Sequence, residues 1–575
     1  MVILGLNAYH GDSAACIVVD GKLIFAIEEE RIRRVKHWAG FPIESIKLCL
    51  KAANLTIQDV DYIGISRNPS AHLHKKLMYS LTKLPKLSSI KDRLNNASKI
   101  GDIKETIAKE FGVTVDSLKA KVQKVEHHRA HLASSFFVTE FNEAALISVD
   151  GFGDFASAMT GKGKGNTIEV YDYVEFPHSM GIFYSAMTQF LGFWNYGDEY
   201  KVMGLAPYGE PKYVEELKKV VSSTSNGFYE LNLDYFIHHT DGVDMVWENG
   251  IPTMGRIFSK KLEDLFGKTR EKDEPVTQFH KDFAASVQRT YEEILFHMLR
   301  NLHSKTKLDT VCISGGCAQN SVANGKIFAN TPFKKVYSPP AGYDAGTAVG
   351  SAYFVWNQIL GNPRVGEVYH AYLGSSFTAE EIEKTLKAEN VEFRKLNETD
   401  LMNETANAII DGKVIGWFQG AMEWGPRALG NRSILGDPRR NDMRDILNLK
   451  IKRRESFRPF APSILEEYVP EYFEETYPVP FMEKVYPVKK DKQSVIPAVT
   501  HVDGSGRLQS VSKKQNDRYW KLIEAFRSKT GVPVLLNTSF NENEPIVHLP
   551  KEALDCYLRT NMDVLVLGDY FISRA

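Results

Sequence analysis

The chain has 575 residues, of which 43% are hydrophobic and 25% are charged, a composition typical of a soluble globular protein with about two to four domains. Lys and Arg (71) balance Asp and Glu (72), which argues against a dedicated nucleic-acid binder, because such proteins carry a basic excess. The 5 cysteines form no CxxC pair, and neither a signal peptide nor a run of about 18 apolar residues is present, so we expect a cytoplasmic protein without a disulfide framework, zinc ribbon or membrane span.

The first part of the chain contains one pattern twice. Strands are predicted at residues 2–6, 14–19 and 22–28, with a polar turn after the first of them. The pattern recurs as a strand at 144–149, a DGFGD turn at 150–154 and a strand at 155–160. Two copies of strand, Gly/Asp turn and strand indicate a duplicated fold in which each half presents a turn to one cleft, as in actin-like and sugar-kinase-like ATPases. Residues 72–122, between the copies, are Lys-rich and helix-prone, which predicts a solvated face.

A candidate metal site begins in the segment VEHHRAHLASSFF. On a helix, His127 and His131 share one face, and imidazoles four residues apart are a suitable metal pair. The Glu of an HExxH protease is missing, and a carboxylate is needed to complete a two-His, one-carboxylate site for Fe(II) or zinc. Asp150 in the DGFGD turn and Asp344 in AGYDAGTAVG are the candidates. Considered alone, an HxxxH pair is more often structural, and Asp344 could equally cap a helix whose glycines serve close packing.

Two further segments have the composition of nucleotide-binding loops. In ISGGCAQNS a strand at 308–313 leads into Gly315 and Gly316 before a helix, where backbone amides can approach a phosphate and Asn320 can add a contact. In GDEYKVMGLAPYG, Lys201 precedes a Gly-punctuated turn that could face a cleft. A tight strand–helix turn and an ordinary surface loop are the alternative interpretations. A helix is expected over residues 281–302, between these two segments.

The last third of the chain differs from the rest in amino-acid composition. A boundary is predicted near residues 360–375, followed by a capping box of Thr378 and Glu381 that begins a helix, and a final helix is expected at 551–559. Between these helices, residues 427–458 carry a basic run among Gly, Pro and aromatic residues, which indicates a bound anion, although a solvated basic surface is the alternative. The run comprises Arg427, Arg432, Arg439, Arg440, Arg444, Lys450, Lys452, Arg453, Arg454 and Arg458. A buried strand is then predicted to lead into Asn537, Ser539 and Asn541.

Taken together, these segments resemble the NodU/CmcH family of O-carbamoyltransferases, from residue 3 to about residue 570. The resemblance rests on the order of the stretches HGDSAACIVVDGKL, EEERIRRVKH, HHRAHLASSF, SVDGFGD, KVMGLAPYG, SGGCAQN, AGYDAGTAVG, GAMEWGPRALGNRSI, FRPFAPS, HVDGSGRLQSV and LNTSFNENEPIV. It implies an α/β protein with a duplicated actin-like ATPase domain, similar to the tRNA threonylcarbamoyl transferase, over residues 1–365. A YrdC-like α/β domain that forms carbamoyladenylate is implied over residues 366–575.

The resemblance also implies a reaction. Carbamoyl phosphate is cleaved to carbamate, which attacks the α-phosphorus of ATP, and the carbamoyl group of the resulting adenylate passes to an acceptor hydroxyl of a secondary metabolite. The implied cofactors are Fe(II) or another divalent metal, and ATP with Mg. The partners are the small-molecule acceptor, ATP and carbamoyl phosphate, with neither nucleic acid nor membrane, and a homodimer is one allowed state. Which acceptor, metal and oligomer apply cannot be deduced from the sequence.

The resemblance also implies which residues form the sites, because each functional position of the family falls in a matching motif of this sequence. The implied metal ligands are His127, His131, Asp150 and Asp344, and the implied catalytic residues are His10 and Asp12, of which His10 serves as a base for the acceptor hydroxyl. Lys201, Gly315, Gly316 and Asn320 match the nucleotide side of the first domain. The carbamoyl-phosphate and adenylate pocket is implied at Arg427, Lys452, Arg458, Arg507, Asn537 and Ser539. The chain departs from the family at Ala421, where many members carry Arg or Lys.

Three other functions agree less well with the sequence. A threonylcarbamoyl-type enzyme that modifies tRNA shares both domain types, but the near-zero net charge argues against an RNA partner. Hydrogenase-maturation carbamoylation would require CxxC repeats and an acylphosphatase module, which the sequence lacks. A non-enzymatic actin-like scaffold would explain neither the basic run nor the HxxxH pair.

Overall fold

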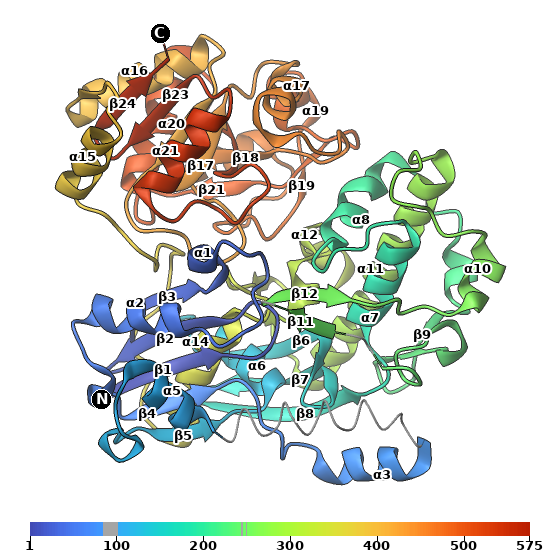
Figure 1. The fold of residues 1–575 in the computed structure, drawn as a ribbon. Helices are drawn as coiled ribbons and strands as arrows, with labels where there is room; N and C mark the ends of the chain where they lie inside the picture. The colour runs from blue at the N-terminus through green and yellow to red at the C-terminus, as the bar shows by residue number, and fades with distance from the viewer. Residues whose placement is uncertain (84–101, 243–244, 249, 575) are drawn as a thin grey trace. The chain divides into compact units, whose positions relative to one another are not determined.

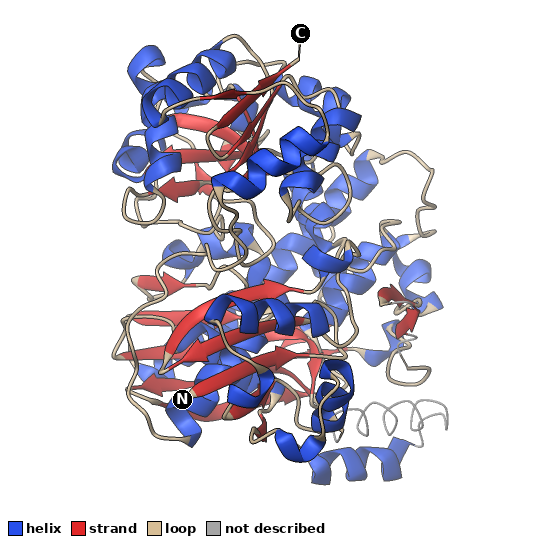
Figure 2. Ribbon diagram, turned by 60° about the vertical axis from the view of Figure 1, so that its left-hand side comes forward, coloured by secondary structure: helices blue, strands red, loops and turns tan. Residues whose placement is uncertain are grey.

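The computed structural model describes residues 1–83, 102–242, 245–248 and 250–574, and these form two compact units (Figure 1). The N-terminal unit comprises Met1–Asn320 and Ile327–Val368, and the C-terminal unit comprises Ser321–Lys326 and Tyr369–Ala575. The sequence placed the division after residue 365 and did not predict the short excursion at 321–326. Figure 2 shows sheets and helices packed together in each unit, and strands and helices are interspersed along the chain, which confirms the predicted mixed α/β class.

The N-terminal unit is built on two five-stranded mixed sheets with the same topology. The first has the order β3-β2-β1-β4-β5 and the second β14-β13-β6-β7-β8. In each, the leading strand (β1 or β6) pairs antiparallel with the next strand of a meander and parallel with a later one (β4 or β13). The predicted duplication is therefore confirmed. The strands are β1 (Val2–Asn7), β2 (Ala14–Val19), β3 (Lys22–Glu28), β4 (Tyr62–Ile65), β5 (Lys121–Lys124), β6 (Glu143–Gly153), β7 (Ala156–Lys164), β8 (Thr167–Glu175), β13 (Thr310–Ser314) and β14 (Lys335–Tyr337).

The DGFGD segment differs from its prediction as a turn. Strand β6 continues to Gly153, with an irregular register between Val149 and Gly153, and only Asp154 and Phe155 connect it to β7. Both connecting residues have positive φ, at 50° and 83°. Regular pairing with β7 is interrupted at Asp150, which lies within this irregular strand end.

Helices α6 (His127–Phe136) and α14 (Gly346–Tyr353) pack against each other in the N-terminal unit. A Cβ added at Gly350 would collide with the carbonyl oxygen of Ala130, and one at Gly346 with that of Ala341. The predicted close packing around these glycines is therefore confirmed, and it brings Asp344, two residues before α14, toward α6.

Other helices and short strands complete the unit. The predicted 281–302 helix is longer, α11 (Gln278–Thr306), because Thr277 and His280 form a capping box before it. Part of the predicted helix-prone stretch, 84–101, lies outside the described residues, and the rest includes α3 and α5. The further elements are α1 (Glu30–Arg33), α2 (Ile43–Ala53), α3 (Leu73–Lys83), α5 (Ile103–Phe111), α7 (Met180–Phe190), α8 (Glu199–Leu205), α9 (Val214–Leu217), α10 (Lys260–Phe266), α13 (Ile327–Asn330), β9 (Val221–Ser223), β10 (Tyr229–Leu231), β11 (Met245–Glu248) and β12 (Ile251–Met254).

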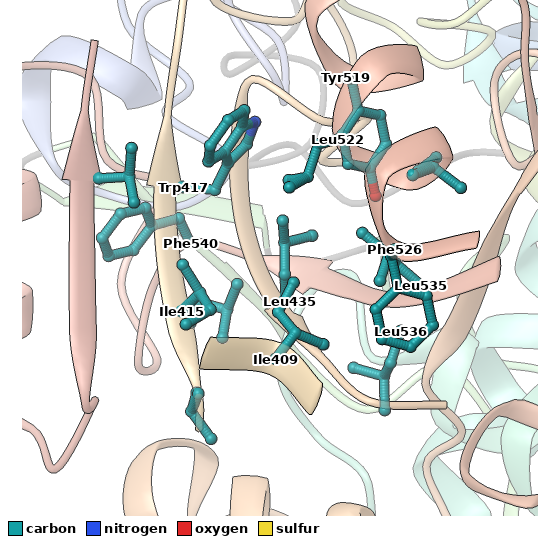
Figure 3. Close-up of a cluster of buried hydrophobic side chains, with 14 of the residues drawn as sticks. Ile409, Ile415, Trp417, Leu435, Tyr519, Leu522, Phe526, Leu535, Leu536 and Phe540 are labelled. Carbon is teal, nitrogen blue, oxygen red and sulfur yellow. The ribbon is translucent and has the colours of Figure 1, made fainter. Parts of the chain in front are cut away.

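The C-terminal unit contains an eight-stranded mixed sheet with the order β15-β24-β23-β16-β17-β22-β18-β21. The strands are β15 (Arg394–Lys395), β16 (Ile415–Phe418), β17 (Arg432–Gly436), β18 (Ala461–Leu465), β21 (Gln509–Val511), β22 (Val534–Ser539), β23 (Val564–Leu567) and β24 (Tyr570–Ser573), and a separate pair is formed by β19 (Tyr486–Pro487) and β20 (Ser505–Gly506). The helices are α12 (Ser321–Gly325), α15 (Ala379–Ala388), α16 (Glu398–Ile410), α17 (Met443–Leu447), α18 (Val469–Tyr472), α19 (Lys490–Gln493), α20 (Asp517–Thr530) and α21 (Pro550–Arg559). Figure 3 shows the core between the sheet and its helices, where Trp417, Phe526 and Phe540 are buried.

The predicted helix signals in this unit are confirmed. The Glu381 amide donates to Thr378 Oγ1 at 3.2 Å and the Thr378 amide to Glu381 Oε2 at 2.8 Å, the two bonds of a capping box. Helix α21 begins one residue before the predicted range. Among the described helices, none combines the length and the apolar character that a bilayer crossing requires.

Candidate metal centre and anion pocket

The four predicted metal ligands converge in the N-terminal unit. His127 and His131 lie one turn apart on α6, Asp150 lies in the irregular end of β6, and Asp344 precedes α14. One ligand atom from each of the four lies within 4.8 Å of all the others. Both histidines are fully buried, and Asp344 is 6% exposed.

The spacing of these atoms fits a single bound cation. The two Nε2 atoms lie 3.1 Å apart, His131 Nε2 lies 2.8 Å from Asp150 Oδ2, and Asp344 Oδ1 lies 3.3 Å from His131 Nε2 and 3.4 Å from His127 Nε2. With metal–ligand bonds of about 2.1 Å, neighbouring ligands of one ion are about 3.0 to 3.4 Å apart. Two imidazoles and two carboxylates suit Fe(II), zinc or another divalent ion, so the residues fit the implied metal.

The electrostatics of the four groups agree with this interpretation. Burial lowers the pKa of His127, but hydrogen bonds to Asp150 and Asp344 outweigh it and raise the pKa well above its usual value. Burial and the charge of Asp344 raise the pKa of Asp150, but hydrogen bonds from the two histidines outweigh them and bring the pKa to about 2. A cation bound by all four groups displaces protons from the imidazoles, because imidazole coordinates a metal in its neutral form.

The glycine turn after β13 contacts one of these ligands. Asp150 Oδ1 accepts hydrogen bonds from the amides of Gly151 at 2.7 Å and Gly316 at 3.1 Å. A Cβ added at Gly315, which has a φ of 94°, would collide with the Val149 backbone. The paired glycines therefore allow two strand ends to approach closely, and they orient Asp150.

The two predicted catalytic residues lie on the loop after β1. His10 Nδ1 is 2.5 Å from Asp344 Oδ2, and the His10 and His127 rings are 5.4 Å apart, so the structure brings His10 to the metal centre. Asp12 is directed elsewhere, since its Oδ1 lies 2.7 Å from Nδ1 of His37.

The other two predicted nucleotide contacts are engaged with protein groups. Lys201 Nζ lies 3.1 Å from Asp198 Oδ1 and over the ring of Phe193. Asn320 exchanges two hydrogen bonds with the side-chain amide of Gln288 on α11, at 2.9 and 3.0 Å. Asn320 thus links the end of the glycine turn to α11, and its prediction as a phosphate contact is not tested by this geometry.

The loop after β4 is a site component that the sequence did not reveal. Arg67 Nη1 donates to the carbonyl of Tyr9 at 2.8 Å. The amides of Asn68 and His127 both donate to Asp154 Oδ2, at 2.7 and 3.0 Å. The segment ISRNPS carries no motif, but β4 runs parallel to β1, so both strands end at the same edge of the sheet. The parallel pairing of β4 with β1 was the signal that could have identified this loop as part of the site.

In the C-terminal unit, eight of the ten residues of the basic run divide into three groups with different surroundings, and Arg444 donates to the carbonyl of Ser456. Arg439 pairs with Asp437, Arg440 with Asp442 and Lys450 with Asp563. A second group, Arg432 and Lys452, is buried and donates to backbone carbonyls. The third group consists of Arg427, Arg454 and Arg458.

The third group lies near enough to Arg507 for its charges to act on that guanidinium, and these four arginines are the candidate anion pocket. Burial lowers the pKa of Arg507 well below its usual value, and the charges of Arg427, Arg454 and Arg458 lower it further. Within the described residues, the buried Nε of Arg507 has no hydrogen-bond partner. Like charges gathered near the half-buried Arg507 suit an anion such as a phosphate. Arg454 was not among the predicted pocket residues, although it stands two positions after Lys452.

Three predicted pocket residues form a polar framework on β22 and the turn after it. Lys452 Nζ donates to the carbonyls of Ser539 and Asn541 and to Asn541 Oδ1, each at 2.7 Å. Ser539 Oγ donates to Asn541 Oδ1 at 2.8 Å. Asn537 Nδ2 donates to the carbonyl of Ala428 at 3.1 Å, which ties β22 to the segment that carries Arg427.

We expect Lys452→Met to loosen this turn. Lys452 is 2% exposed and three acceptors would lose a charged donor, so the free energy of unfolding of the C-terminal unit should fall by about 3 kcal/mol. Hydrogen exchange of the β22 amides under urea measures this change. Lys450→Met is the matched control, because Lys450 forms a half-exposed pair with Asp563 and should cost less than about 1 kcal/mol. Equal effects of the two substitutions would contradict the assignment.

Comparison with known proteins assigns the chain to a family. Residues 2–353 match the family model for the carbamoyltransferase N-terminus, and residues 406–574 match the carbamoyltransferase C-terminus. An uncharacterized protein of Synechocystis sp. is 39% identical over 100% of this chain and 96% of its own length. Nodulation protein NolNO of Sinorhizobium fredii is 38% identical over 99% of this chain and 80% of its own length.

Two further comparisons cover part of the chain. The 3'-hydroxymethylcephem-O-carbamoyltransferase of Amycolatopsis lactamdurans is 36% identical over 46% of this chain and 48% of its own length. Among solved structures, HypF from T. kodakarensis matches 63% of this chain and 48% of that chain at 14% identity, with a TM-score of 0.30. The family models span most of the sequence, and the full-length relatives agree with them. The chain belongs to the carbamoyltransferase family that includes the NodU and cephem O-carbamoyltransferase proteins, and it is a transferase of carbamoyl groups.

Proposed function

We propose that this carbamoyltransferase uses ATP and carbamoyl phosphate to carbamoylate a hydroxyl group of a small secondary metabolite. The observation that carries the proposal is the cluster of Arg427, Arg454 and Arg458 around Arg507, which suits the phosphate oxygens of these two substrates. Membership of the family, and a relative named for the carbamoylation of a hydroxymethylcephem, support a hydroxyl as the acceptor.

Activation belongs to the C-terminal unit in this proposal. Water cleaves carbamoyl phosphate to carbamate and phosphate, and a carbamate oxygen attacks the α-phosphorus of ATP, so that carbamoyladenylate forms and pyrophosphate leaves. Negative charge is spread over several oxygens during both steps, and fixed guanidinium groups stabilise it. Asn537 ties β22 to the segment that carries Arg427, and Lys452 holds the turn after β22.

Transfer belongs to the N-terminal unit. The acceptor oxygen attacks the carbamoyl carbon, AMP leaves, and the hydroxyl proton passes to a base. His10 is the candidate base, because it lies at the metal centre with its Nδ1 2.5 Å from Asp344 Oδ2. His127, His131, Asp150 and Asp344 would hold Fe(II) or another divalent cation, and such an ion supplies Lewis-acid polarisation of a carbonyl or phosphoryl oxygen.

The test is a reconstitution with defined substrates. Purified protein, loaded with Fe(II), is incubated with Mg-ATP and carbamoyl phosphate, and pyrophosphate release is measured. The same mixture is screened by mass spectrometry against a hydroxymethylcephem, an N-acetylglucosamine oligosaccharide and a hydroxylated alkaloid for the gain of one carbamoyl group. Pyrophosphate release that requires both substrates supports the activation step, and a carbamoylated product supports the acceptor class. Tight, salt-sensitive binding of tRNA without any carbamoylated small molecule would favour a tRNA-modifying enzyme instead.

A further inference from the structure

A partly buried carboxylate–imidazole pair lies close to the metal centre and shares none of its four candidate ligands. Asp12 Oδ1 is 2.7 Å from His37 Nδ1, and the His37 amide donates to Glu30 Oε2 at 2.8 Å. The Asp12 side chain is 9% exposed and the His37 side chain 31%. His37 ends the segment EEERIRRVKH, which matches the family but has no role in the proposed chemistry.

The pair is part of a set of bonds that fasten the His10 loop to residues 37–40. On one side of His10, the Tyr9 amide donates to the carbonyl of Gly40 at 3.0 Å. On the other side, the Ser13 amide donates to the carbonyl of Trp38 at 2.8 Å, and Ser13 Oγ donates to that of Gly40 at 2.7 Å. His10 is thus at the tip of a loop fixed on both flanks, with its own ring against Asp344.

The backbone of this loop adopts conformations that need support from its surroundings. Tyr9, Asp12 and His37 have φ values of 55°, 58° and 56°, in the left-handed region that costs energy for residues with a Cβ. Such conformations persist only when neighbouring contacts hold them. The Asp12–His37 pair joins two of the three residues directly.

The other ring nitrogen of His37 faces protein rather than an open site. A Cβ added at Gly197, whose φ is 84°, would collide with His37 Nε2. The His37 and Tyr196 rings meet edge to face at 5.3 Å, and a Cβ added at Gly11 would collide with the Tyr196 hydroxyl. This enclosure favours a role in holding the loop over a role in proton transfer.

The charges of the two side chains strengthen the contact between Asp12 and His37. Burial lowers the pKa of His37, but the charge of Asp12 and the hydrogen bond to it outweigh burial and raise the pKa to about 9. At neutral pH the imidazole is therefore charged, and the two side chains form an ion pair with little access to water, where such pairs are screened less than at the surface.

We propose that the Asp12–His37 pair, closed by Tyr196 and Gly197, positions His10 against Asp344 for carbamoyl transfer. Asp12 then acts through His37, and not as an acid or base on the substrate. This inference rests on the proposed function, because it assigns a role in the transfer step. It also accounts for Gly197 at the start of GDEYKVMGLAPYG, where a larger residue would push the imidazole away from Asp12.

The test compares His37→Ala with His37→Asn in the full-length, Fe(II)-loaded protein. Asparagine can donate from Nδ2 in place of Nδ1, so it retains the bond to Asp12, whereas alanine cannot. We expect His37→Ala to lower kcat for transfer to the acceptor found in the mass screen by about 10²-fold with little change in KM, because a small misplacement of a catalytic group has this cost. His37→Asn should recover most of that loss, and Gly197→Ala should resemble His37→Ala.

A second readout needs no acceptor. Hydrogen exchange of the Tyr9 and Ser13 amides should accelerate in His37→Ala and stay near wild type in His37→Asn. His303→Ala is the matched control, since His303 is also half-buried in the same unit and also meets an aromatic ring, Phe333, edge to face. It should change neither readout.

The outcomes separate this inference from the proposed function. If the wild type releases no pyrophosphate and carbamoylates no compound, the proposed function fails. If the wild type is active but His37→Ala matches it in kcat and exchange, the positioning role is wrong. If His37→Asn is as inactive as His37→Ala while its amide exchange is normal, His37 carries a proton itself, and the positioning role is again wrong.

Discussion

Replacing Arg507 with methionine should lower pyrophosphate release from ATP and carbamoyl phosphate by about 10³-fold while it raises the thermal stability of the protein. Arg507 is surrounded by the like charges of Arg427, Arg454 and Arg458, which together with burial depress its pKa. A depressed arginine pKa means that the folded state disfavours the charged form, so the charge costs stability at every pH below that pKa. Methionine keeps much of the apolar stem and removes this cost, and a rise in Tm of about 2 °C is expected.

The measurements are a coupled pyrophosphate assay and thermal unfolding with and without inorganic phosphate. Phosphate should raise the Tm of the wild type and have less effect on the variant, because a ligand stabilises only the state that binds it. Arg439→Met is the matched control: Arg439 pairs with Asp437 and lies over the ring of Phe526, so its loss should lower the Tm and leave pyrophosphate release intact. Unchanged pyrophosphate release in Arg507→Met would show that the candidate anion pocket takes no part in forming carbamoyladenylate.

The elements most accurately predicted from sequence are those whose signals are local. The strands at 14–19 and 22–28 have the predicted bounds, because apolar runs ended by a Gly turn determine them. The His127/His131 pair needed only the helical repeat, and Asp344 needed only its place before a glycine-rich helix. The convergence of Asp150 on the same point was a family expectation, and its geometry depends on the irregular end of β6, which no short motif encodes.

What the sequence did not reveal depends on contacts between distant segments. Residues 321–326 join the C-terminal unit because Gly325 lets the chain pack on the backbone of Val485, and the Val485 amide donates to Ser321 at 2.9 Å. Arg67 reaches the His10 loop only because β4 lies parallel to β1. The different surroundings of the basic residues also depend on tertiary contacts. Lys450 and Lys452 are two residues apart, yet Lys450 pairs with the carboxylate of Asp563 and Lys452 donates to backbone carbonyls.

The second large effect is expected at the metal centre. His131→Ala should reduce bound metal from about one ion per chain to a small fraction, and abolish carbamoyl transfer, while pyrophosphate release continues. His131 Nε2 lies between Asp150 Oδ2 at 2.8 Å and Asp344 Oδ1 at 3.3 Å, so the substitution removes one of four ligands. It also leaves two buried carboxylates with less positive charge beside them. Inductively coupled plasma mass spectrometry of the Fe(II)-loaded protein measures the metal.

His128→Asn separates loss of metal from damage to helix α6. His128 is equally buried on the same helix, but its Nδ1 lies 2.8 Å from Ser148 Oγ and it is not among the converging ligands. It should retain metal and transfer. Because His131 is fully buried, His131→Ala also leaves a cavity that lowers stability. His131→Gln, which keeps polar atoms in the same space, should show the same loss of metal with a smaller fall in Tm. Normal metal content in both His131 variants would rule out the four-residue centre, whereas metal loss with normal transfer would show that the reaction does not need the ion.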